Sequence, residues 1–403
     1  MYIVSFSVFL SVVLLLVLAL LVVESQVVQK GDRKIVINDD PEKSLQAPPG
    51  RTLLSALAAK GIYLASACGG KGSCAMCKCR VEEGARGILP TEMPHLTRAE
   101  KRQNVRLACQ VKVKEDLKIH IPPEIFNIKK YTATVVSNEN VATFIKELVL
   151  GLDGNERIDF SSGQYIQIDI PEYELEYEKI DVGQRFRSVW DKFGLWGLHA
   201  QAEEPVFRAY SMANTPEEDH LKFTVRIATP PPGSDVPPGI ASSYLFGLKP
   251  QDKVILGGPY GEFLIKETDK EMCFVGGGAG MAPMRSHIFT QLLIKKTRRQ
   301  MTFWYGARSK SEMFYDAEFQ ELAQNFENFS YYVALSDPMP EDNWEGLTGF
   351  IHQAAHDQYL SKHKDPAEIE YYLCGPPPMI AAVKEMLDSL GVEPEMIAYD
   401  DFG

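Results

Sequence analysis

The sequence predicts a multidomain protein of mixed α+β and α/β class, and three observations along its 403 residues support that prediction. An uncharged apolar run at the start predicts one transmembrane helix. Short alternating runs between residues 130 and 266 predict an antiparallel barrel, and from Glu271 onward strands alternate with helices, which predicts a parallel sheet. Hydrophobic residues make up 45% of the chain, which excludes intrinsic disorder. A net charge of −12 without a basic run argues against nucleic-acid binding.

The first two dozen residues form the most apolar part of the chain. Tyr2 to Val23 contains no charged side chain, and 17 of those 22 residues are Leu, Val, Ile or Phe. As a helix this run spans about 33 Å, enough to cross a hydrocarbon core of about 30 Å. A cleaved signal peptide is the rival interpretation, but the run lacks a basic leading segment and a small-residue cleavage site. Because Lys30, Arg33 and Lys34 follow it, we expect a retained single-pass anchor over residues 1–26, with the remainder in the cytoplasm.

A first module is expected over residues 27–125. Residues 34–37 have the composition of a strand, Gly50 to Ala59 predicts a short helix, and Leu107 to Ile121 returns to a strand pattern before two prolines mark a boundary. Seven cysteines are few for a disulfide scaffold of this length. Five of them fall between Cys68 and Cys109, which indicates a metal or cluster site in a reducing compartment.

Four of these cysteines have the spacing of a ligand set. Cys68-x5-Cys74-x2-Cys77 places three thiols on one glycine-rich loop, and Cys109 follows thirty-two residues later. Four thiolates suit zinc or an iron–sulfur cluster, although structural zinc usually uses two separate cysteine pairs. The loop resembles the plant-type [2Fe–2S] ferredoxin motif, with one more residue in its first gap. This resemblance implies a β-grasp domain with the cluster held by these four cysteines; Cys79 is a fifth thiol, which geometry alone does not exclude.

Two segments of the predicted barrel, residues 126–268, have side chains suited to a flavin. In one of them Arg208 can pair with a pyrophosphate, Tyr210 can pack on an aromatic ring, and Ser211 can hydrogen-bond a ring nitrogen or carbonyl. In the other, Gly239 and Ser242 form a Gly-x-x-Ser helix start, whose amides favour a diphosphate. In this order the segments resemble the R-x-Y-[ST] and Gly-x-x-Ser motifs of the ferredoxin-NADP reductase family. That resemblance implies FAD bound at these residues and a catalytic role for Ser242.

Two turns in the last module, residues 269–403, suit a pyridine nucleotide. The first follows a strand and opens a helix, so backbone amides there favour a pyrophosphate; its glycines are Gly276, Gly277, Gly278 and Gly280. The second is Cys374-Gly375-Pro376, which two further prolines make rigid. The turns resemble the glycine-rich loop and the C-G-P-x-x-M motif of the ferredoxin reductase family. The resemblance implies that Cys374 helps to position the nicotinamide, although a lone cysteine is by default a packing residue.

The end of the chain concerns the flavin, and the end of the second strand of the last module concerns the choice between NADH and NADPH. Phe402 supplies an aromatic ring where reductases of this family stack one on the flavin, with the difference that a glycine follows it here. Arg308 could meet a 2′-phosphate, whereas Asp316 or Glu318 could accept a hydrogen bond from a free 2′-hydroxyl. We favour NADH over NADPH.

Residues 171–204 interrupt the barrel pattern and have no obvious chemistry; we call them the insertion. Acids alternate through its first part, and Trp190, Phe193 and Trp196 follow at a spacing of three. One interpretation is a solvated loop with a helix packed on its own barrel. The other is a docking helix for a membrane partner, because large exposed apolar patches rarely occur without a use.

The order of the modules has a chemical logic. Hydride arrives as two electrons and an iron–sulfur cluster accepts one, so a flavin between them converts the pair into single electrons. The anchor–ferredoxin–FAD–NADH order resembles, along the whole chain, the F subunits of the sodium-translocating NADH:quinone reductases. This resemblance implies NADH:quinone oxidoreductase activity, with FAD and a [2Fe–2S] cluster as cofactors and NADH as substrate, in the bacterial inner membrane beside partner subunits. A single helix cannot form an ion path, so sodium and quinone sites must lie in those partners.

Two other functions stay open from the sequence. A reductase component of an oxygenase shares the order of the soluble modules, but it normally lacks the apolar segment Tyr2–Val23. A catalytically silent redox-sensing subunit would bind nucleotide without turnover. The presence of Cys374, Ser242, Tyr210 and Phe402 argues against that second alternative.

Overall fold

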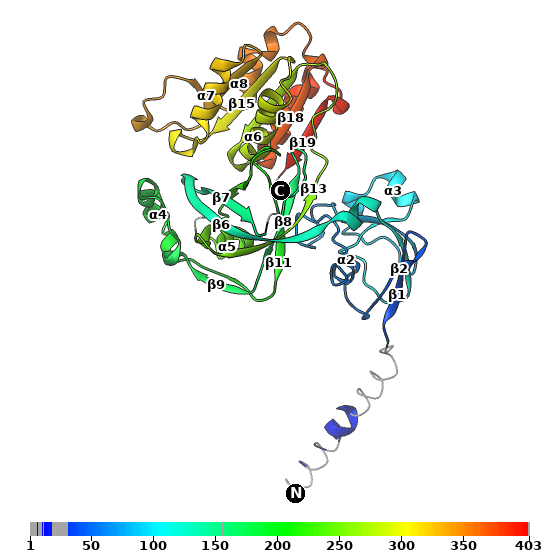
Figure 1. The fold of residues 1–403 in the computed structure, drawn as a ribbon. Coiled ribbons are helices and arrows are strands. Elements are labelled where there is room, and N and C mark those ends of the chain that lie inside the picture. The colour runs from blue at the N-terminus through cyan, green and yellow to red at the C-terminus, as the bar shows by residue number, and fades with distance from the viewer. Residues whose placement is uncertain are drawn as a thin grey trace. The chain divides into compact units, whose positions relative to one another are not determined.

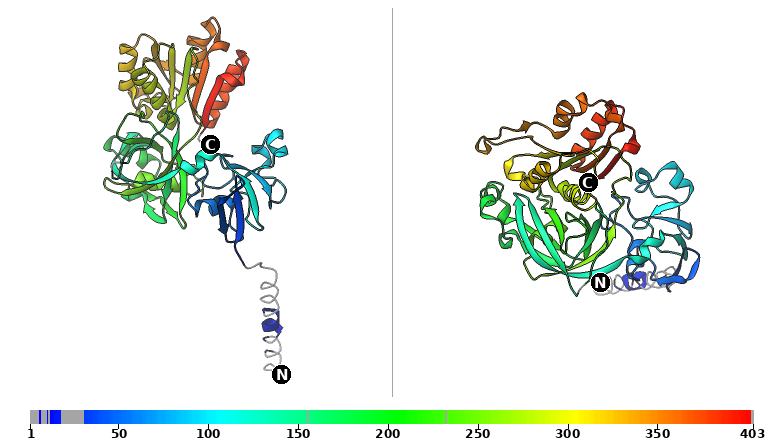
Figure 2. Two further views of the ribbon diagram at one scale, coloured as in Figure 1. Left: turned by 45° about the vertical axis from the view of Figure 1, so that its right-hand side comes forward. Right: turned by 45° about the horizontal axis from the view of Figure 1, so that its top comes forward.

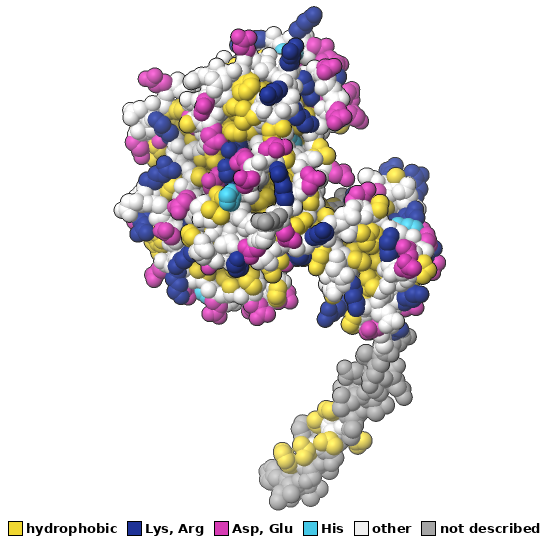
Figure 3. Space-filling view, viewed as in Figure 1, with side chains coloured by type: hydrophobic (Ala, Val, Ile, Leu, Met, Phe, Trp, Pro, Cys, Tyr) yellow, Lys and Arg dark blue, Asp and Glu magenta, His cyan; other side chains and the backbone are white. Residues whose placement is uncertain are grey.

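The computed structural model describes residues 6, 10, 12–17, 31–154, 156–231 and 233–401, which divide into two compact units (Figure 1). The first comprises Met1–Leu64 and Gly70–Asn127, and the second comprises Ala65–Gly69 and Ile128–Gly403. Among the described residues no helix is both long and apolar enough to cross a membrane. The predicted anchor falls mostly outside them. Its described members expose their apolar side chains, as Figure 3 shows, with Leu15 at 67%.

The first unit is built on a five-stranded mixed sheet with the order β2-β1-β5-β3-β4, in which β1 and β5 run parallel. Its strands are β1 (Arg33–Ile37), β2 (Asp40–Ala47), β3 (Lys78–Glu83), β4 (Val105–Leu107) and β5 (Leu117–His120), and its helices are α2 (Leu53–Ala58) and α3 (Arg98–Arg102). Thr52 begins α2 by accepting a hydrogen bond from the Ser55 amide, and α2 buries Leu53 and Leu57. The strand pattern expected from Leu107 to Ile121 is found as two short strands, with β4 ending at Leu107, a turn at residues 108–110, and β5 beginning at Leu117.

The second unit begins with the barrel, a six-stranded antiparallel sheet in the order β11-β8-β13-β6-β7-β12. Its strands are β6 (Lys129–Ala142), β7 (Ile145–Leu152), β8 (Tyr165–Ile170), β11 (Val206–Ser211), β12 (Leu221–Arg226) and β13 (Lys253–Tyr260). A bridge between Met212 and Phe223 joins the two outer strands and closes the sheet. On β13, Val254 and Leu256 are buried while Ile255 between them is 48% exposed, as the predicted period of two requires. Helix α5 (Ile240–Gly247) packs into the same core.

The insertion folds onto this barrel. Strands β9 (Tyr173–Glu176) and β10 (His199–Ala202) pair antiparallel, and helix α4 (Arg187–Lys192) lies between them in sequence. Trp190 of α4 is fully buried in the barrel core, and its indole N–H donates a 3.1 Å hydrogen bond to the Thr143 carbonyl. The interpretation that the helix packs on its own barrel is therefore confirmed.

The last part of the second unit is a six-stranded parallel sheet in the order β17-β16-β15-β14-β18-β19. Its strands are β14 (Met272–Gly277), β15 (Met301–Ala307), β16 (Phe329–Leu335), β17 (Leu347–Thr348), β18 (Glu370–Gly375) and β19 (Ile397–Asp401). The left-hand view of Figure 2 shows helices on both sides of this sheet. Helices α6 (Met281–Phe289) and α7 (Asp316–Asn325) cover one face, and α8 (Ile351–Gln358) and α9 (Pro377–Ser389) cover the other.

The predicted βα alternation is thus confirmed, with one change at the first helix. A π-helical turn, Thr290–Ile294, continues α6 to near the predicted end. The strand order reverses between β14 and β18, which pair in parallel. In open α/β sheets, ligands bind at the carboxyl ends of the strands at such a reversal.

Candidate functional site

Three of the four predicted cluster ligands come together in the first unit. Cys77 and Cys109 are buried and Cys74 is half-buried, and none of the described cysteines forms a disulfide. A hydrogen bond with Cys109, together with burial and the neighbouring Cys74 thiol, raises the pKa of Cys77 well above its ordinary value. Thiols this close and this dry need a nearby positive charge before they can all ionise, and iron ions supply it. The donor set therefore fits an iron–sulfur cluster.

The glycines of the loop explain how the chain brings these thiols together. Gly70 has a φ of +85°, a conformation that favours glycine, and it packs beside Cys109: a Cβ added there would lie 3.5 Å from the Leu54 Cδ2 and 3.8 Å from the Cys109 Cβ. Cys68 is half-buried in the segment that groups with the second unit. Cys79 is buried on β3, and burial raises the pKa of its thiol to about 12. Its position in the strand favours a packing role.

A buried ion pair, which the sequence did not reveal, supports the chain before Cys109. Glu92 is fully buried and accepts hydrogen bonds from the Arg106 guanidinium, one of them at 2.6 Å, and from the Leu107 amide at 2.9 Å. Burial opposes ionisation of Glu92, but these donors outweigh it and lower its pKa. The spacing of Glu92 and Arg106 in sequence carries no signal, because a buried pair is visible only once the fold is known.

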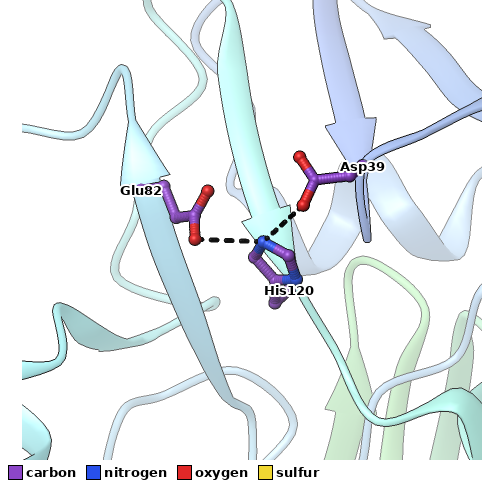
Figure 4. A group of neighbouring side chains, drawn as sticks. All are labelled: Asp39, Glu82 and His120. Atoms are coloured by element: carbon purple, nitrogen blue, oxygen red, sulfur yellow. Dashed lines mark ion pairs between the residues drawn. The ribbon is translucent and has the colours of Figure 1, made fainter.

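A second charged group lies on the edge of the same sheet. Asp39, Glu82 and His120 point toward one another from the turn after β1 and from β3 and β5 (Figure 4). The Lys118 ammonium lies 2.7 Å from Asp39 and 3.1 Å from Glu82. Its hydrogen bonds lower the pKa of both carboxyls. Because a lysine already balances these charges, we interpret the group as a surface ion-pair network.

The predicted flavin strand, β11, forms one side of the barrel. Arg208 is half-buried there, and its guanidinium donates to the Phe207 carbonyl at 2.7 Å. It has no ion-pair partner in the part of the chain that the structure describes, so its charge is available for an anion. Burial raises the pKa of Tyr210 and keeps the phenol neutral. Ser211 donates a 3.3 Å hydrogen bond to Asp400 of β19. A half-buried cation beside a neutral aromatic ring suits a flavin with its diphosphate.

The second flavin segment begins helix α5. The Ser242 hydroxyl accepts a hydrogen bond from the Ala228 amide at 3.1 Å and donates one to the Gly239 carbonyl at 3.2 Å. A side chain on Gly239 would lie 2.7 Å from the Ala228 Cβ, so only glycine fits. These contacts show Ser242 shaping the helix start, and its predicted catalytic role stays a prediction.

The two nucleotide turns meet at the strand reversal. Gly276 pairs with Cys374 across β14 and β18, and a Cβ on Gly280 would lie 2.2 Å from the Cys374 carbonyl oxygen. Cys374 is fully buried at the end of β18. Gly375 and Pro376 follow it and lead into α9. The sequence predicted both turns, and the structure brings them into direct backbone contact.

A cavity of about 590 Å³ opens beside these turns. Gly277, Gly278 and Pro376 line it from the parallel sheet, and Ile145 and Arg226 line it from the barrel. Its size and its position at the carboxyl ends of the strands suit a dinucleotide.

The acids that face this cavity are not the ones that the sequence suggested. Arg308 lines it and pairs with Asp337 at 3.1 Å, and Glu312 lines it as well. Glu318 instead pairs with Arg285 at 2.9 Å, and neither Glu318 nor Asp316 lines the cavity. Asp337 follows β16 and was missed because sequence alone does not show which strand ends flank the cavity. Phe402, the predicted flavin-stacking residue, lies outside the described residues.

Comparisons with known proteins agree with this geometry. A 2Fe-2S iron-sulfur cluster binding domain matches residues 36–114, an oxidoreductase FAD-binding domain matches residues 196–265, and an oxidoreductase NAD-binding domain matches residues 274–385. The fold and the site thus define an iron–sulfur flavoprotein reductase that uses NADH, FAD and a [2Fe–2S] cluster.

Relatives over the full length give the particular family. The chain is 51% identical to the F subunit of the Na(+)-translocating NADH-quinone reductase of Mannheimia succiniciproducens, over 100% of this chain and 99% of that one. It is 53% identical to the protein of the same name from Actinobacillus pleuropneumoniae, over 98% and 97%. The chain belongs to the family of Na(+)-translocating NADH-quinone reductase F subunits.

Solved structures show how widely the fold is used. A cytochrome P450 reductase, GcoB, of Amycolatopsis has a TM-score of 0.63 at 24% identity, over 92% of this chain and 98% of that chain. The ferredoxin reductase in carbazole 1,9a-dioxygenase has a TM-score of 0.61 at 24% identity, over 93% and 99%. The oxygenase reductases therefore share the fold, whereas the F subunits share half of the sequence as well.

Proposed function

We propose that NADH binds in the cavity beside β14 and β18, that FAD binds along β11 and the start of α5, and that the cluster is held in the cysteine loop. One observation supports this most directly: the same cavity is lined by the nucleotide turns and by the barrel. The barrel side of the cavity is lined by Ile145 of β7 and Arg226 of β12, and β12 meets the proposed flavin strand β11 through the bridge between Met212 and Phe223. The proposed domains are residues 27–125 for the cluster, 126–268 for FAD and 269–403 for NADH.

The chain is the electron-input subunit of an NADH:quinone oxidoreductase. When bound, FAD takes both electrons of a hydride and releases them singly, and a [2Fe–2S] cluster accepts one electron at a time. The residues of the chain bind and orient these groups. In this proposal Arg208 neutralises the flavin diphosphate, and Tyr210, Ser211, Gly239 and Ser242 shape the flavin site.

In the nucleotide site, the absence of side chains lets the diphosphate of NADH approach the protein backbone at the start of α6. The glycines concerned are Gly276, Gly277, Gly278 and Gly280. Cys374, with Gly375 and Pro376, would limit where the nicotinamide can lie, and Phe402, which lies outside the described residues, stays the candidate for stacking on the flavin ring. Cys68, Cys74, Cys77 and Cys109 provide the four cluster ligands.

We also propose that residues 2–23 anchor the chain in the bacterial inner membrane, with the other modules on the cytoplasmic side. The lack of any charged side chain from Tyr2 to Val23 supports this. Exposed apolar side chains such as Phe6, at 67%, and Leu14, at 59%, suit a lipid environment. Other membrane subunits of the complex would then receive the electrons and carry the sodium and quinone sites. Alkaline washing of membranes should leave the full chain bound but release a chain that lacks residues 2–23.

The electron relay is tested by titrating the full chain with NADH under anaerobic conditions while absorbance and electron paramagnetic resonance spectra are recorded. Bleaching of the flavin with the signal of a reduced [2Fe–2S] cluster is the expected result. Absence of bleaching with NADH would contradict the proposed nucleotide site, and bleaching with NADPH alone would reverse the cofactor assignment.

A further inference from the structure

The insertion forms one wall of the proposed NADH cavity. Val189 and Lys192 of α4, together with Phe193, the residue that follows, line the cavity. The neighbouring wall is Thr143-Phe144, the two-residue turn between β6 and β7. The insertion contains no recognisable functional motif, yet it reaches the site where the dinucleotide is proposed to bind.

This wall is held in a fixed place. The buried Trp190 donates its indole N–H to the carbonyl of Thr143, so α4 is tied to the same turn that lines the cavity. Phe193 packs edge-on against Phe144, with ring centroids 6.1 Å apart. Trp196 stabilises the end of the helix by donating a 2.7 Å hydrogen bond to Asp191. These contacts hold the backbone of Lys192 in place beside the cavity.

The charges around the cavity show what this wall can bind. Lys192 and Arg226 are exposed, and neither side chain has an ion-pair or hydrogen-bond partner among the described residues. The third cation of the cavity, Arg308, is already paired with Asp337. Two unpaired cations thus face a cavity next to the glycine turn of the parallel sheet. A dinucleotide has two negative charges on its diphosphate, and unpaired Lys and Arg side chains are the groups that recognise phosphate.

We infer that the insertion is part of the NADH site, and that Lys192 binds a phosphate of the dinucleotide across the cavity from the glycine turn. This inference rests on the proposed function, because it requires NADH in this cavity. Phe193, which is 45% exposed, adds an apolar surface beside Lys192 on the same wall. The insertion then tunes the affinity for NADH, while the reacting nicotinamide is positioned elsewhere, at Cys374.

The test is the rate of flavin reduction by NADH, measured by anaerobic stopped-flow on the full chain with FAD bound. The dependence of the rate on NADH concentration gives an apparent Kd and a limiting rate. For Lys192→Gln we expect the apparent Kd to rise about 3- to 10-fold while the limiting rate changes by less than about two-fold. Lys192→Arg should keep most of the wild-type affinity. Added salt should weaken NADH binding less steeply in Lys192→Gln than in the wild type.

Lys179→Gln is the matched control, because Lys179 is an exposed lysine of the same insertion that does not line the cavity. An apparent Kd for Lys192→Gln equal to that of the control would overturn the inference. So would a loss confined to the limiting rate, which would place Lys192 in the chemistry of hydride transfer. Failure of NADH to reduce the wild-type flavin would instead refute the proposed function itself.

Discussion

The imidazole of His287 should make the stability of the second unit depend on pH. His287 lies on α6 with none of its surface exposed, in a cage of rings made by Phe263, Phe274 and Tyr372. The Phe263 ring is nearly perpendicular to it, with centroids 5.1 Å apart. Burial lowers the pKa of His287 from 6.5 to about 3, more than the nearby Phe263 carbonyl raises it. The folded protein therefore keeps this side chain neutral at a pH where the unfolded chain would protonate it.

The sign and size of the effect follow from the two pKa values. Because the folded pKa is the lower one, the stabilisation is complete above pH 6.5 and is lost as the pH falls from 6.5 toward 3. Each pH unit in that window is worth about 1.4 kcal/mol. Lowering the pH from about 7.5 to about 5.0 crosses about 1.5 units of the window, so it should cost about 2 kcal/mol of unfolding free energy.

The assay is urea denaturation of the full chain followed by the fluorescence of released FAD, at both pH values. His287→Gln removes the titrating group but keeps a polar side chain of similar size, so it serves as the comparison. Between the two pH values the wild type should lose about 2 kcal/mol more than the variant, since all other titrating groups are shared. Parallel losses in the two proteins would refute the reasoning.

Four further predictions concern the site. Gly280→Ala would place a methyl group 2.2 Å from the Cys374 carbonyl oxygen, so it should destabilise the second unit by about 1–3 kcal/mol and slow flavin reduction by NADH; unchanged stability in urea would contradict the close contact. Cys374→Ala should slow flavin reduction by NADH while FAD stays bound, and an unchanged rate would remove its proposed role. Cys109→Ala should lose the cluster but keep flavin reduction by NADH, whereas an intact [2Fe–2S] signal would implicate Cys79. Glu92→Gln leaves a buried arginine without its counter-charge, so it should cost the first unit about 3 kcal/mol in urea unfolding; a cost near zero would show that the pair contributes little.

Much of the fold could be predicted because its signals are local. The strands of the barrel alternate residue by residue, and the glycine turn of the last module stands between a strand and a helix, so each can be recognised within a few residues. The break inside the interval from Leu107 to Ile121 was not predicted, because its apolar residues all fit a strand pattern. In the fold that interval contains a turn at residues 108–110, which includes Cys109, and β5 begins only at Leu117.

The residues of the site could be predicted where they belong to one contiguous motif. They could not be predicted where residues far apart in the sequence meet only in the folded chain. Cys374 and Gly280 each stand in a recognisable turn, so both could be named beforehand. Lys192, Arg226 and Asp337 come from three separate parts of the chain and meet only because the barrel and the parallel sheet share one cavity. No pattern near any of them points to a nucleotide, so their convergence is visible only in three dimensions.

The strand order of the barrel has a consequence for how the protein is made. Strand β13, the last of the barrel strands to be synthesised, lies between β6 and β8, and its residue Lys253 pairs with Thr134. The barrel therefore cannot close until the ribosome has passed about 120 residues beyond β6, a wait of about 6 to 24 seconds at ordinary rates of synthesis. All four cysteines of the ligand set have been made before then. The order of synthesis thus lets the cluster site form before the flavin site exists.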